Sequence, residues 1–193
     1  ALREALADAH GGPAERVRVE QVDAMRADWP TLVGDGTGWS MASNLPYNVA
    51  VPLLLELLEV APAMAPLVVM VQREVADRIV ADAGGAAYGA VSLKVAFHAD
   101  ARLVRTVPPE VFWPEPSVDS AIVRLDPHAP RVQVPRGMLF RVIDEGFAQR
   151  RKTMTNALRR LGVGRDEAAA ILAAADVALH ARAETLDLDA FAR

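Results

Sequence analysis

The hexapeptide at residues 43–48, with the sequence SNLPYN, constrains the fold of this chain more than any other stretch. An apolar run at residues 39–42 precedes it, and residues 50–58 follow with the apolar spacing of a helix. This order predicts the end of a strand and the start of a helix, at the carboxyl edge of a sheet. Because open α/β sheets bind their ligands at that edge, we expect a binding site at the hexapeptide.

The residue types in the hexapeptide favour one kind of ligand. Leu45 precedes a proline, which favours an extended backbone whose carbonyl can point outward. Asn44 offers a carboxamide oxygen as an acceptor, and Tyr47 offers a flat aromatic face. Two acceptors beside a stacking surface suit an amino group on a flat heterocycle. The alternative is an Asn-Pro turn that caps the helix, with the tyrosine packed into the core.

The rest of the pattern predicts an α/β sheet. The apolar run at residues 67–71 is typical of a strand buried on both faces of a parallel sheet. Further helices are predicted at residues 1–7, 72–81 and 88–97, and further strands at residues 16–22, 102–107 and 118–125. The last two strands should be antiparallel, because no crossover helix lies between them. Asp23, at the carboxyl edge of the strand at residues 16–22, can accept a hydrogen bond from an amine or cap a turn.

Composition excludes several classes of protein. Of the 193 residues, 52% are hydrophobic and 24% are charged, so the chain can bury a substantial core. It has no cysteine, which excludes a disulfide framework, a thiolate metal site and a cysteine nucleophile. We find no run of about 18 uncharged apolar residues that would span a membrane, and no secretory signal. A cytoplasmic protein without a metal site is therefore expected.

Positive charge is concentrated in the carboxyl-terminal third of the chain. The net charge is −4, yet residues 131–165 hold nine basic and two acidic residues. Such a cationic segment indicates a phosphate-binding surface, with a solvated basic helix face as the alternative. A proline-containing linker at residues 128–135 precedes it, and the pattern beyond is helical. We therefore predict two domains, at residues 1–127 and 128–193, the second being a helical RNA-binding domain.

Five segments, in order, resemble the family of ribosomal RNA adenine dimethyltransferases. They are QVDA at residues 21–24, NLPYN at 44–48, MVQREVA at 70–76, VFWPEPSVDSA at 111–121 and FAQRRKT at 147–153. The similarity is closest to the small-subunit branch, known by the resistance to kasugamycin that follows its loss. The resemblance implies a Rossmann-like class I methyltransferase sheet with a small all-α carboxyl-terminal domain.

The resemblance also implies an activity. Members of the branch use S-adenosylmethionine to dimethylate N6 of two adjacent adenosines near the 3′ end of small-subunit rRNA. This implies a role in ribosome maturation, with the small ribosomal subunit as partner, and we expect a monomer.

Site residues follow from the same resemblance. Asp23, together with Ala24 and Asn44, would bind S-adenosylmethionine, with Asp23 accepting from the exocyclic amine of its adenine. In the catalytic motif, which includes Pro46, the N6 of the target adenine would be held by Asn44 and the Leu45 carbonyl. Tyr47 would stack on that base. Phe112 would make a second aromatic contact, although Trp113 is equally placed in the sequence. The basic residues expected to contact RNA are Arg150, Arg151, Lys152, Arg159 and Arg160.

One hallmark of the family is missing from the sequence. The glycine-rich loop after the first strand, and the acidic residue after the second that holds the cofactor ribose, would precede Ala1. The glycines at positions 34, 36 and 38 do not replace that loop, because they precede a strand instead of following one. An absent amino-terminal segment, and weak cofactor binding by the chain as it stands, are therefore expected.

Three other functions are compatible with the sequence. A large-subunit rRNA methyltransferase, of the type that confers macrolide resistance, shares the central motif. A ribosome-assembly factor or RNA-binding protein could keep the fold without transferring methyl groups. A DNA adenine methyltransferase is a third alternative, disfavoured by the arginine-rich helical segment and by the lack of a sequence-reading domain.

Overall fold

The computed structural model describes residues 20–149 and 151–193. Its centre is a four-stranded mixed sheet with the strand order β1-β2-β4-β3. β1 (Met41–Asn44) is parallel to β2 (Leu67–Gln72), with Asn44 opposite Met70. β4 (Ser120–Pro127) is antiparallel to β2 and also to β3 (Ala99–Val107). The antiparallel pair predicted from residues 102–107 and 118–125 is therefore confirmed.

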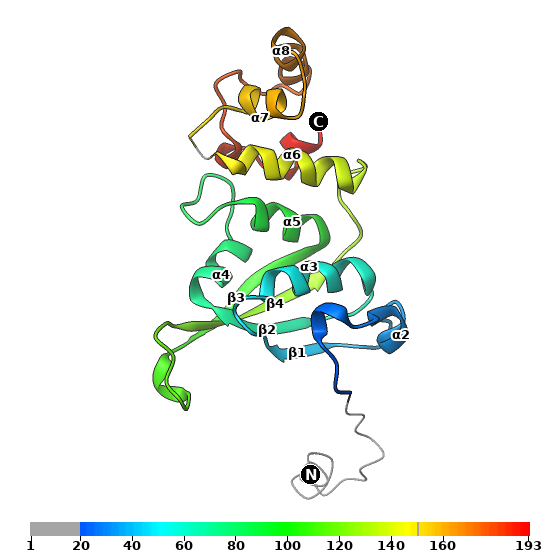
Figure 1. Cartoon of the computed structure of the whole chain (residues 1–193), viewed down its shortest axis with the longest axis vertical. Helices are drawn as coiled ribbons and strands as arrows, with labels where there is room; N and C mark the ends of the chain where they lie inside the picture. Colours follow the sequence, from blue (N-terminus) through cyan, green and yellow to red (C-terminus); the bar gives the residue numbers. More distant parts are fainter. Residues whose placement is uncertain (1–19, 150) are drawn as a thin grey trace, which may run out of the picture.

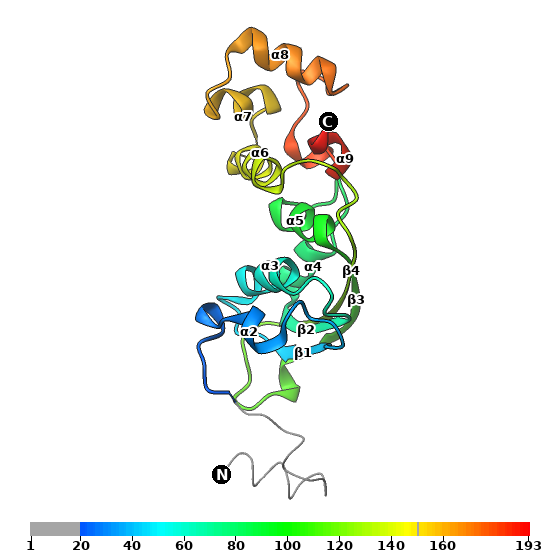
Figure 2. The same ribbon diagram turned by 90° about the vertical axis from the view of Figure 1, so that its right-hand side faces the viewer.

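Helices α3 (Ala50–Val60), α4 (Arg73–Ile79) and α5 (Ala90–His98) lie over one face of this sheet (Figures 1 and 2). The buried stripe of α3 includes Leu54 and Leu57, which share one core with Val69 of β2 and Val123 of β4. Pro52 lies in the first turn of α3, where a missing N–H group leaves no intrahelical bond unmade. The helices expected from residues 50–58, 72–81 and 88–97 are thus present.

Strand β2 differs from the prediction of a strand buried on both faces among parallel neighbours. Its residues alternate between buried and half-buried, and one of its two neighbours is antiparallel. Val69 and Val71 face the helices and are fully buried, whereas Val68 and Met70 on the other face are partly covered. A continuous apolar run indicates that both faces of a strand lack charged side chains, but it does not indicate the direction of the neighbouring strands.

The turn predicted around the glycines at positions 34–38 connects α2 (Trp29–Val33) to β1. Asp28 begins α2 by accepting a hydrogen bond from the Thr31 N–H at 3.1 Å. Gly36 has a φ of 90°, and a Cβ there would lie 2.6 Å from the Met64 nitrogen. Only glycine fits this close approach, which brings the turn against the segment between α3 and β2.

The strand expected at residues 16–22 is not present in its described part. Residues 20–22 have no strand geometry, and Asp23 caps a 3-10 helix, η2 (Ala24–Arg26). A strand needs a neighbour for its backbone hydrogen bonds, and among residues 20–149 and 151–193 the sheet ends at β1. The helix expected at residues 1–7 lies outside the described residues.

Helices α6 (Arg136–Ala148), α7 (Met154–Arg160), α8 (Arg165–Ala174) and α9 (Leu188–Ala192), with η4 (Ala183–Thr185), form the end of the molecule distant from the sheet (Figure 1). The face of α6 that carries Leu139 and Ile143 packs against Leu93 and Phe97 of α5. A separate apolar cluster joins α7 to α8. The boundary at residue 127 stays a prediction, since an apolar core continues across it.

Ion pairs reinforce the contact between the carboxyl-terminal part of the chain and the elements that precede it. Lys94 of α5 lies 2.6 Å from the Asp144 carboxylate of α6, and Arg131 lies 2.6 Å from Asp100. Arg136 pairs with Glu59 of α3. Among the described residues, no helix is long and apolar enough to cross a membrane.

Candidate active site

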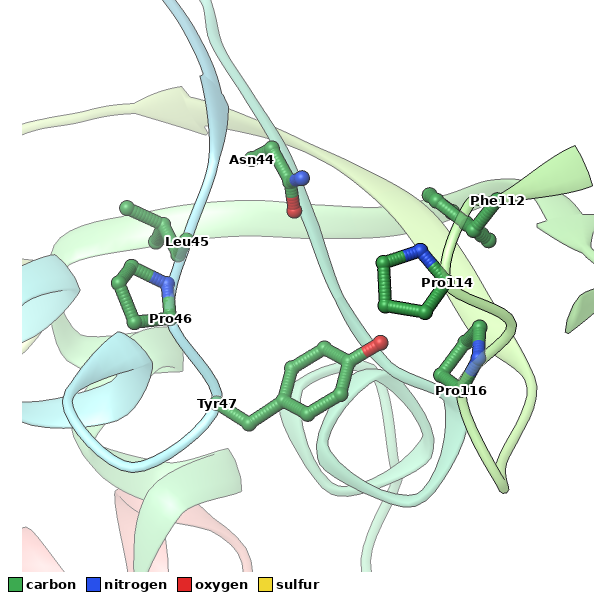
Figure 3. A pocket seen from close by; sticks show the side chains of 7 residues that line it. All are labelled: Asn44, Leu45, Pro46, Tyr47, Phe112, Pro114 and Pro116. Carbon is green, nitrogen blue, oxygen red and sulfur yellow. The ribbon is translucent and has the colours of Figure 1, made fainter.

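The end of β1 fixes the first two residues of the NLPY motif. The Leu45 N–H donates to the Met70 carbonyl at 3.1 Å, which continues the parallel pairing one residue past the strand. The Leu45 side chain is 3% exposed and anchors this backbone in the core. Asn44 alternates to the other side and is exposed. Its carboxamide points into an open cavity (Figure 3).

Tyr47 is held by a contact across the sheet. Its hydroxyl lies 2.9 Å from the Ser120 Oγ at the start of β4, and Ser120 is fully buried. The bond fixes the far end of the phenol ring, so the aromatic face stands at the wall of the cavity (Figure 3). The ring itself is half-buried.

The structure contradicts the alternative in which this segment caps a helix. The N-cap of α3 is Val49, which receives no side-chain hydrogen bond, and Asn44 lies five positions earlier. The chain turns instead through a backbone bond from the Val49 N–H to the Pro46 carbonyl at 3.1 Å. Asn44 therefore has no capping role in α3, and its exposed amide is free of that constraint.

The opposite wall is the loop at residues 108–119, which includes η3 (Pro109–Val111). Together the two segments enclose a cavity of about 320 Å³ lined by Asn44, Leu45, Pro46, Tyr47, Phe112, Pro114 and Pro116. All five residues predicted for the catalytic motif thus line one cavity, and none of the lining residues is charged. Trp113 does not line it. Pro114 and Pro116 were missed, although the proline spacing in the loop is visible in the sequence.

Arg73, in the segment MVQREVA, holds this loop in place. Its N–H donates to the Asp119 carbonyl at 2.9 Å, and its guanidinium donates to Thr106 of β3 at 2.6 Å and to Asp77 at 2.8 Å. The side chain therefore ties the end of β2 to the stem of the loop. A second cavity of about 490 Å³ adjoins this junction, lined by residues 72–74, Pro109 and residues 117–119.

The predicted cofactor residues Asp23 and Ala24 do not line the NLPY cavity. The Asp23 carboxylate is exposed, accepts a hydrogen bond from the Met25 N–H at 3.0 Å, and lies 3.8 Å from Arg26 Nε. The Ala24 carbonyl accepts from the Trp29 indole N–H at 3.1 Å. Asp23 thus acts as a turn cap, which was one of the two roles that the sequence predicted for it. Its carboxylate oxygens have capacity for a further donor, because each accepts more than one hydrogen bond.

The basic segment forms a second, cationic cavity between the end of α6 and α7. Its volume is about 320 Å³, and it is lined by Gln149, Lys152, Asn156, Arg159 and Arg160. Three of the five predicted RNA-binding residues therefore share one cavity. Arg151 is exposed outside this lining, and Arg150 lies outside the described residues.

Arg160 differs from the other two cations of this cavity. Its Nε lies 2.7 Å from the Glu145 carboxylate, and its guanidinium also donates to the Glu145 carbonyl near the end of α6. The charge is therefore largely neutralised within the protein. Arg131 and Arg136, which also contribute to the basic segment, are likewise engaged in ion pairs. In the described part of the chain, no group of three or more acidic or histidine residues is placed to hold a metal ion.

Comparison with known proteins finds relatives that are named as ribosomal RNA methyltransferases. The chain is 43% identical to the ribosomal RNA small subunit methyltransferase A of Cutibacterium acnes, covering 97% of this chain and 64% of that protein. It is 43% identical to the protein of the same name from Thermobifida fusca, covering 100% of this chain and 67% of the relative. The chain thus spans about two thirds of the length of these curated relatives, and slightly less of the first.

Two solved structures share the fold. A dimethyladenosine transferase from Plasmodium falciparum superposes with a TM-score of 0.78 at 21% identity, covering 97% of this chain and 74% of that one. The 23S rRNA methyltransferase ErmE superposes with a TM-score of 0.69 at 21% identity, covering 98% and 75%. These similarities confirm the expected methyltransferase fold. The family model described as ribosomal RNA adenine dimethylase matches residues 2–193, so this chain belongs to the ribosomal RNA adenine dimethylase family.

Proposed function

We propose that the protein of which this chain is part dimethylates N6 of two adjacent adenosines near the 3′ end of small-subunit rRNA, with S-adenosylmethionine as methyl donor. The observation that carries this proposal is the gathering of Asn44, Leu45, Tyr47 and Phe112 around one uncharged cavity at the carboxyl edge of the sheet. The names of the 43% identical relatives support the small-subunit target. A cytoplasmic location and a role in ribosome maturation accompany the proposal.

The cavity suits a neutral, flat heterocycle. Its lining has no charged side chain, and Tyr47 and Phe112 supply aromatic faces. Stacking of a base on an aromatic side chain contributes about 1–3 kcal/mol. A base must leave its stack to enter such a cavity, and target bases of nucleic-acid-modifying enzymes are extruded in this way. Adenine satisfies these requirements because its amino group offers two donors.

Asn44 and Leu45 would act on the amino group itself. The lone pair of adenine N6 is delocalised into the ring, which makes the nitrogen a poor nucleophile. Hydrogen bonds from both N6–H groups to the Asn44 carboxamide oxygen and the Leu45 carbonyl would favour a tetrahedral nitrogen with a localised lone pair. These acceptors orient the nitrogen and stabilise the charge that develops on it. A strong general base is not required, because the alkylated nitrogen readily loses its proton.

The cofactor would be bound by Asp23, Ala24 and Asn44. When bound, S-adenosylmethionine supplies a methyl group on a positively charged sulfur. The exposed Asp23 carboxylate has the acceptor capacity that an adenine amine needs, beyond its bond to Met25. Because Asn44 ends β1 and borders the cavity, it can lie between the cofactor and the target base.

RNA would reach the cavity along a basic surface. Lys152 and Arg159 line the cationic cavity and have no acidic partner among residues 20–149 and 151–193, so they suit phosphate contacts. Arg151, which is exposed, would extend this surface, and Arg160 would support it through Glu145. Arg150, outside the described residues, stays a prediction from the sequence. The end of α6 and the loop at residues 108–119 lie toward the same side of the molecule (Figure 1). A single RNA segment on that side could approach both.

The proposal is tested by methyl transfer to undermethylated small subunits with the full-length protein, followed by nucleoside analysis. We expect dimethyladenosine from the wild type and a loss of about 100-fold or more with Asn44→Ala, because the lost acceptor acts mainly at the transition state. Asn48→Ala is the matched control: this exposed asparagine of the same motif does not line the cavity, and activity should persist. If the wild type methylates no adenine on any ribosomal RNA, a non-catalytic assembly factor replaces the enzyme.

A further inference from the structure

The loop at residues 108–119 carries an aromatic side chain that the proposed reaction does not use. Trp113 is 98% exposed, although tryptophan is among the most buried residues on average. The other two tryptophans are different: Trp29 packs against the main core and donates to the Ala24 carbonyl, and Trp39 is 50% exposed. The indole beside the cavity is therefore accessible to a binding partner.

Trp113 faces away from the cavity that its two neighbours line. Phe112 is extended, with φ −110° and ψ 151°, and the chain bends at residues 112–114. Phe112 and Pro114 both line the cavity, whereas Trp113 between them does not and is almost fully exposed, so its side chain lies outside the cavity at the rim. The Phe112 N–H donates to the Pro109 carbonyl at 3.0 Å, and the neighbouring prolines restrict the backbone further. The indole is thus presented on a constrained loop.

The charge of the loop indicates what kind of RNA group it can meet. Residues 108–119 contain Glu110, Glu115 and Asp119 and no lysine or arginine. A phosphate would be repelled by these carboxylates, whereas the face of a base would not. The loop is therefore suited to a nucleobase and complements the cationic cavity at α6 and α7, which is suited to phosphate.

We propose that Trp113 stacks on the nucleobase adjacent to the target adenine in the RNA strand. This inference rests on the proposed function. When the target base leaves its stack to enter the cavity, its neighbour loses one stacking partner, and the indole replaces it. Phe112 and Trp113 then hold two consecutive bases from neighbouring positions of one loop. Trp113 is a positioning residue, because it lowers the cost of extruding the target without touching it.

The test uses the full-length protein and a synthetic, protein-free RNA hairpin that carries the two adenosines near the 3′ end of small-subunit rRNA. Trp113→Ala should weaken binding about fivefold or more, the low end of measured base-stacking effects. The salt dependence of binding should stay unchanged, since no phosphate contact is lost. The matched control is Val111→Ala, another exposed apolar residue of the loop that does not line the cavity, and it should bind as the wild type does.

Two further measurements locate the contact. Saturating RNA should quench the tryptophan fluorescence of the wild type, and this quenching should be lost in Trp113→Phe. In hairpins with an abasic site on the 5′ or the 3′ side of the target, one of the two should abolish the difference between wild type and Trp113→Ala. Absence of quenching, an unchanged affinity of Trp113→Ala, or an effect that persists with both abasic RNAs would overturn the inference.

The outcomes also separate this inference from the proposed function. Quenching and an abasic-sensitive loss of affinity, without methyl transfer by the wild type, would retain the Trp113 contact and reject the enzyme. Methyl transfer that is normal in the wild type, with binding of Trp113→Ala impaired only on assembled subunits, would indicate a ribosomal protein as the partner of the indole and reject the base contact.

Discussion

The two cavities of about 320 Å³ are equal in size and opposite in chemistry. The cavity at the carboxyl edge of the sheet has no charged lining residue and two aromatic ones. The cavity between α6 and α7 has three cations and no aromatic side chain. The lining of the first suits recognition of a base by shape and hydrogen bonds, and the cations of the second suit attraction of a polyanion. In RNA-binding proteins phosphate contacts position and base contacts specify, and under the proposed function these two tasks fall on different elements of the chain.

Among the residues of the NLPY cavity, Tyr47 should have the largest effect on methyl transfer after Asn44. Tyr47→Ala removes the stacking surface, and we expect methyl transfer to fall about 5- to 150-fold, corresponding to about 1–3 kcal/mol. Tyr47→Phe keeps the ring and removes only the hydrogen bond to Ser120. Its cost should appear mainly as about 1 kcal/mol of folding stability. Steady-state methyl transfer and urea unfolding of both variants separate the two roles, and equal activity losses would place the function in the hydroxyl.

RNA binding through the cationic cavity between α6 and α7 should depend on the salt concentration. Lys152→Ala combined with Arg159→Ala should weaken RNA binding and reduce the log–log salt slope by about 1.4, because each single-stranded phosphate contact contributes about 0.7. The matched control is the double variant Arg141→Ala and Arg165→Ala, which removes the same charge from exposed helical positions outside the cavity. Equal slopes for the two double variants would mean that general charge, not this cavity, attracts the RNA.

The folding stability that comes from the contact between α5 and α6 should depend on pH. Burial, aided by the nearby positive charges of Arg136 and His128, lowers the pKa of His98 to about 4. Because the unfolded chain protonates this histidine near pH 6.5, stability is present above that pH and is lost as pH falls toward 4. The slope should be at most about 1.4 kcal/mol per pH unit.

Urea unfolding between pH 7 and 4.5 measures this effect. His98→Phe should flatten the profile, since its ring can keep the edge contacts with Phe97 and Phe140 without a proton to gain. His180→Asn, at an exposed histidine, should retain the slope of the wild type. A wild-type profile that is no steeper than that of His98→Phe would exclude His98 as the source.

The smallest effect concerns Arg160, which should contribute less to the salt dependence of RNA binding than Arg159 of the same cationic cavity. Because its guanidinium is paired with Glu145, Arg160→Ala should cost about 1 kcal/mol of stability and change the salt slope less than Arg159→Ala does. Glu145→Gln should cost a similar amount of stability without weakening RNA binding. A slope change in Arg160→Ala equal to that in Arg159→Ala would return Arg160 to the RNA-contacting group.

What the sequence predicted well was local. The NLPY motif and its strand-to-helix context are encoded within a few residues, and the resemblance added Phe112 from a loop 65 positions later than Tyr47. The structure adds contacts that no local pattern encodes, such as Tyr47 to Ser120 across 73 positions and Arg136 to Glu59 across 77. Such pairs depend on how strands and helices meet.

What the sequence did not reveal has the same origin. A run of basic residues does not reveal which charges are consumed within the fold, as those of Arg131, Arg136 and Arg160 are. An apolar strand pattern does not reveal the direction of a neighbour, as β2 demonstrates. The roles of Asp23 and Ala24 in cofactor binding stay predictions, since the structure gives only their local contacts.

The separation of base recognition from phosphate attraction is tested most directly by one crossed experiment. Methyl transfer by the full-length protein is measured over a range of RNA and salt concentrations for Asn44→Ala and for the Lys152→Ala, Arg159→Ala double variant. The account predicts that Asn44→Ala lowers kcat by about 100-fold or more with unchanged KM and salt slope. The double variant should instead raise KM and lower the slope, with kcat retained at saturating RNA. Both variants losing kcat and KM in the same proportion, with the same salt slope, would contradict it.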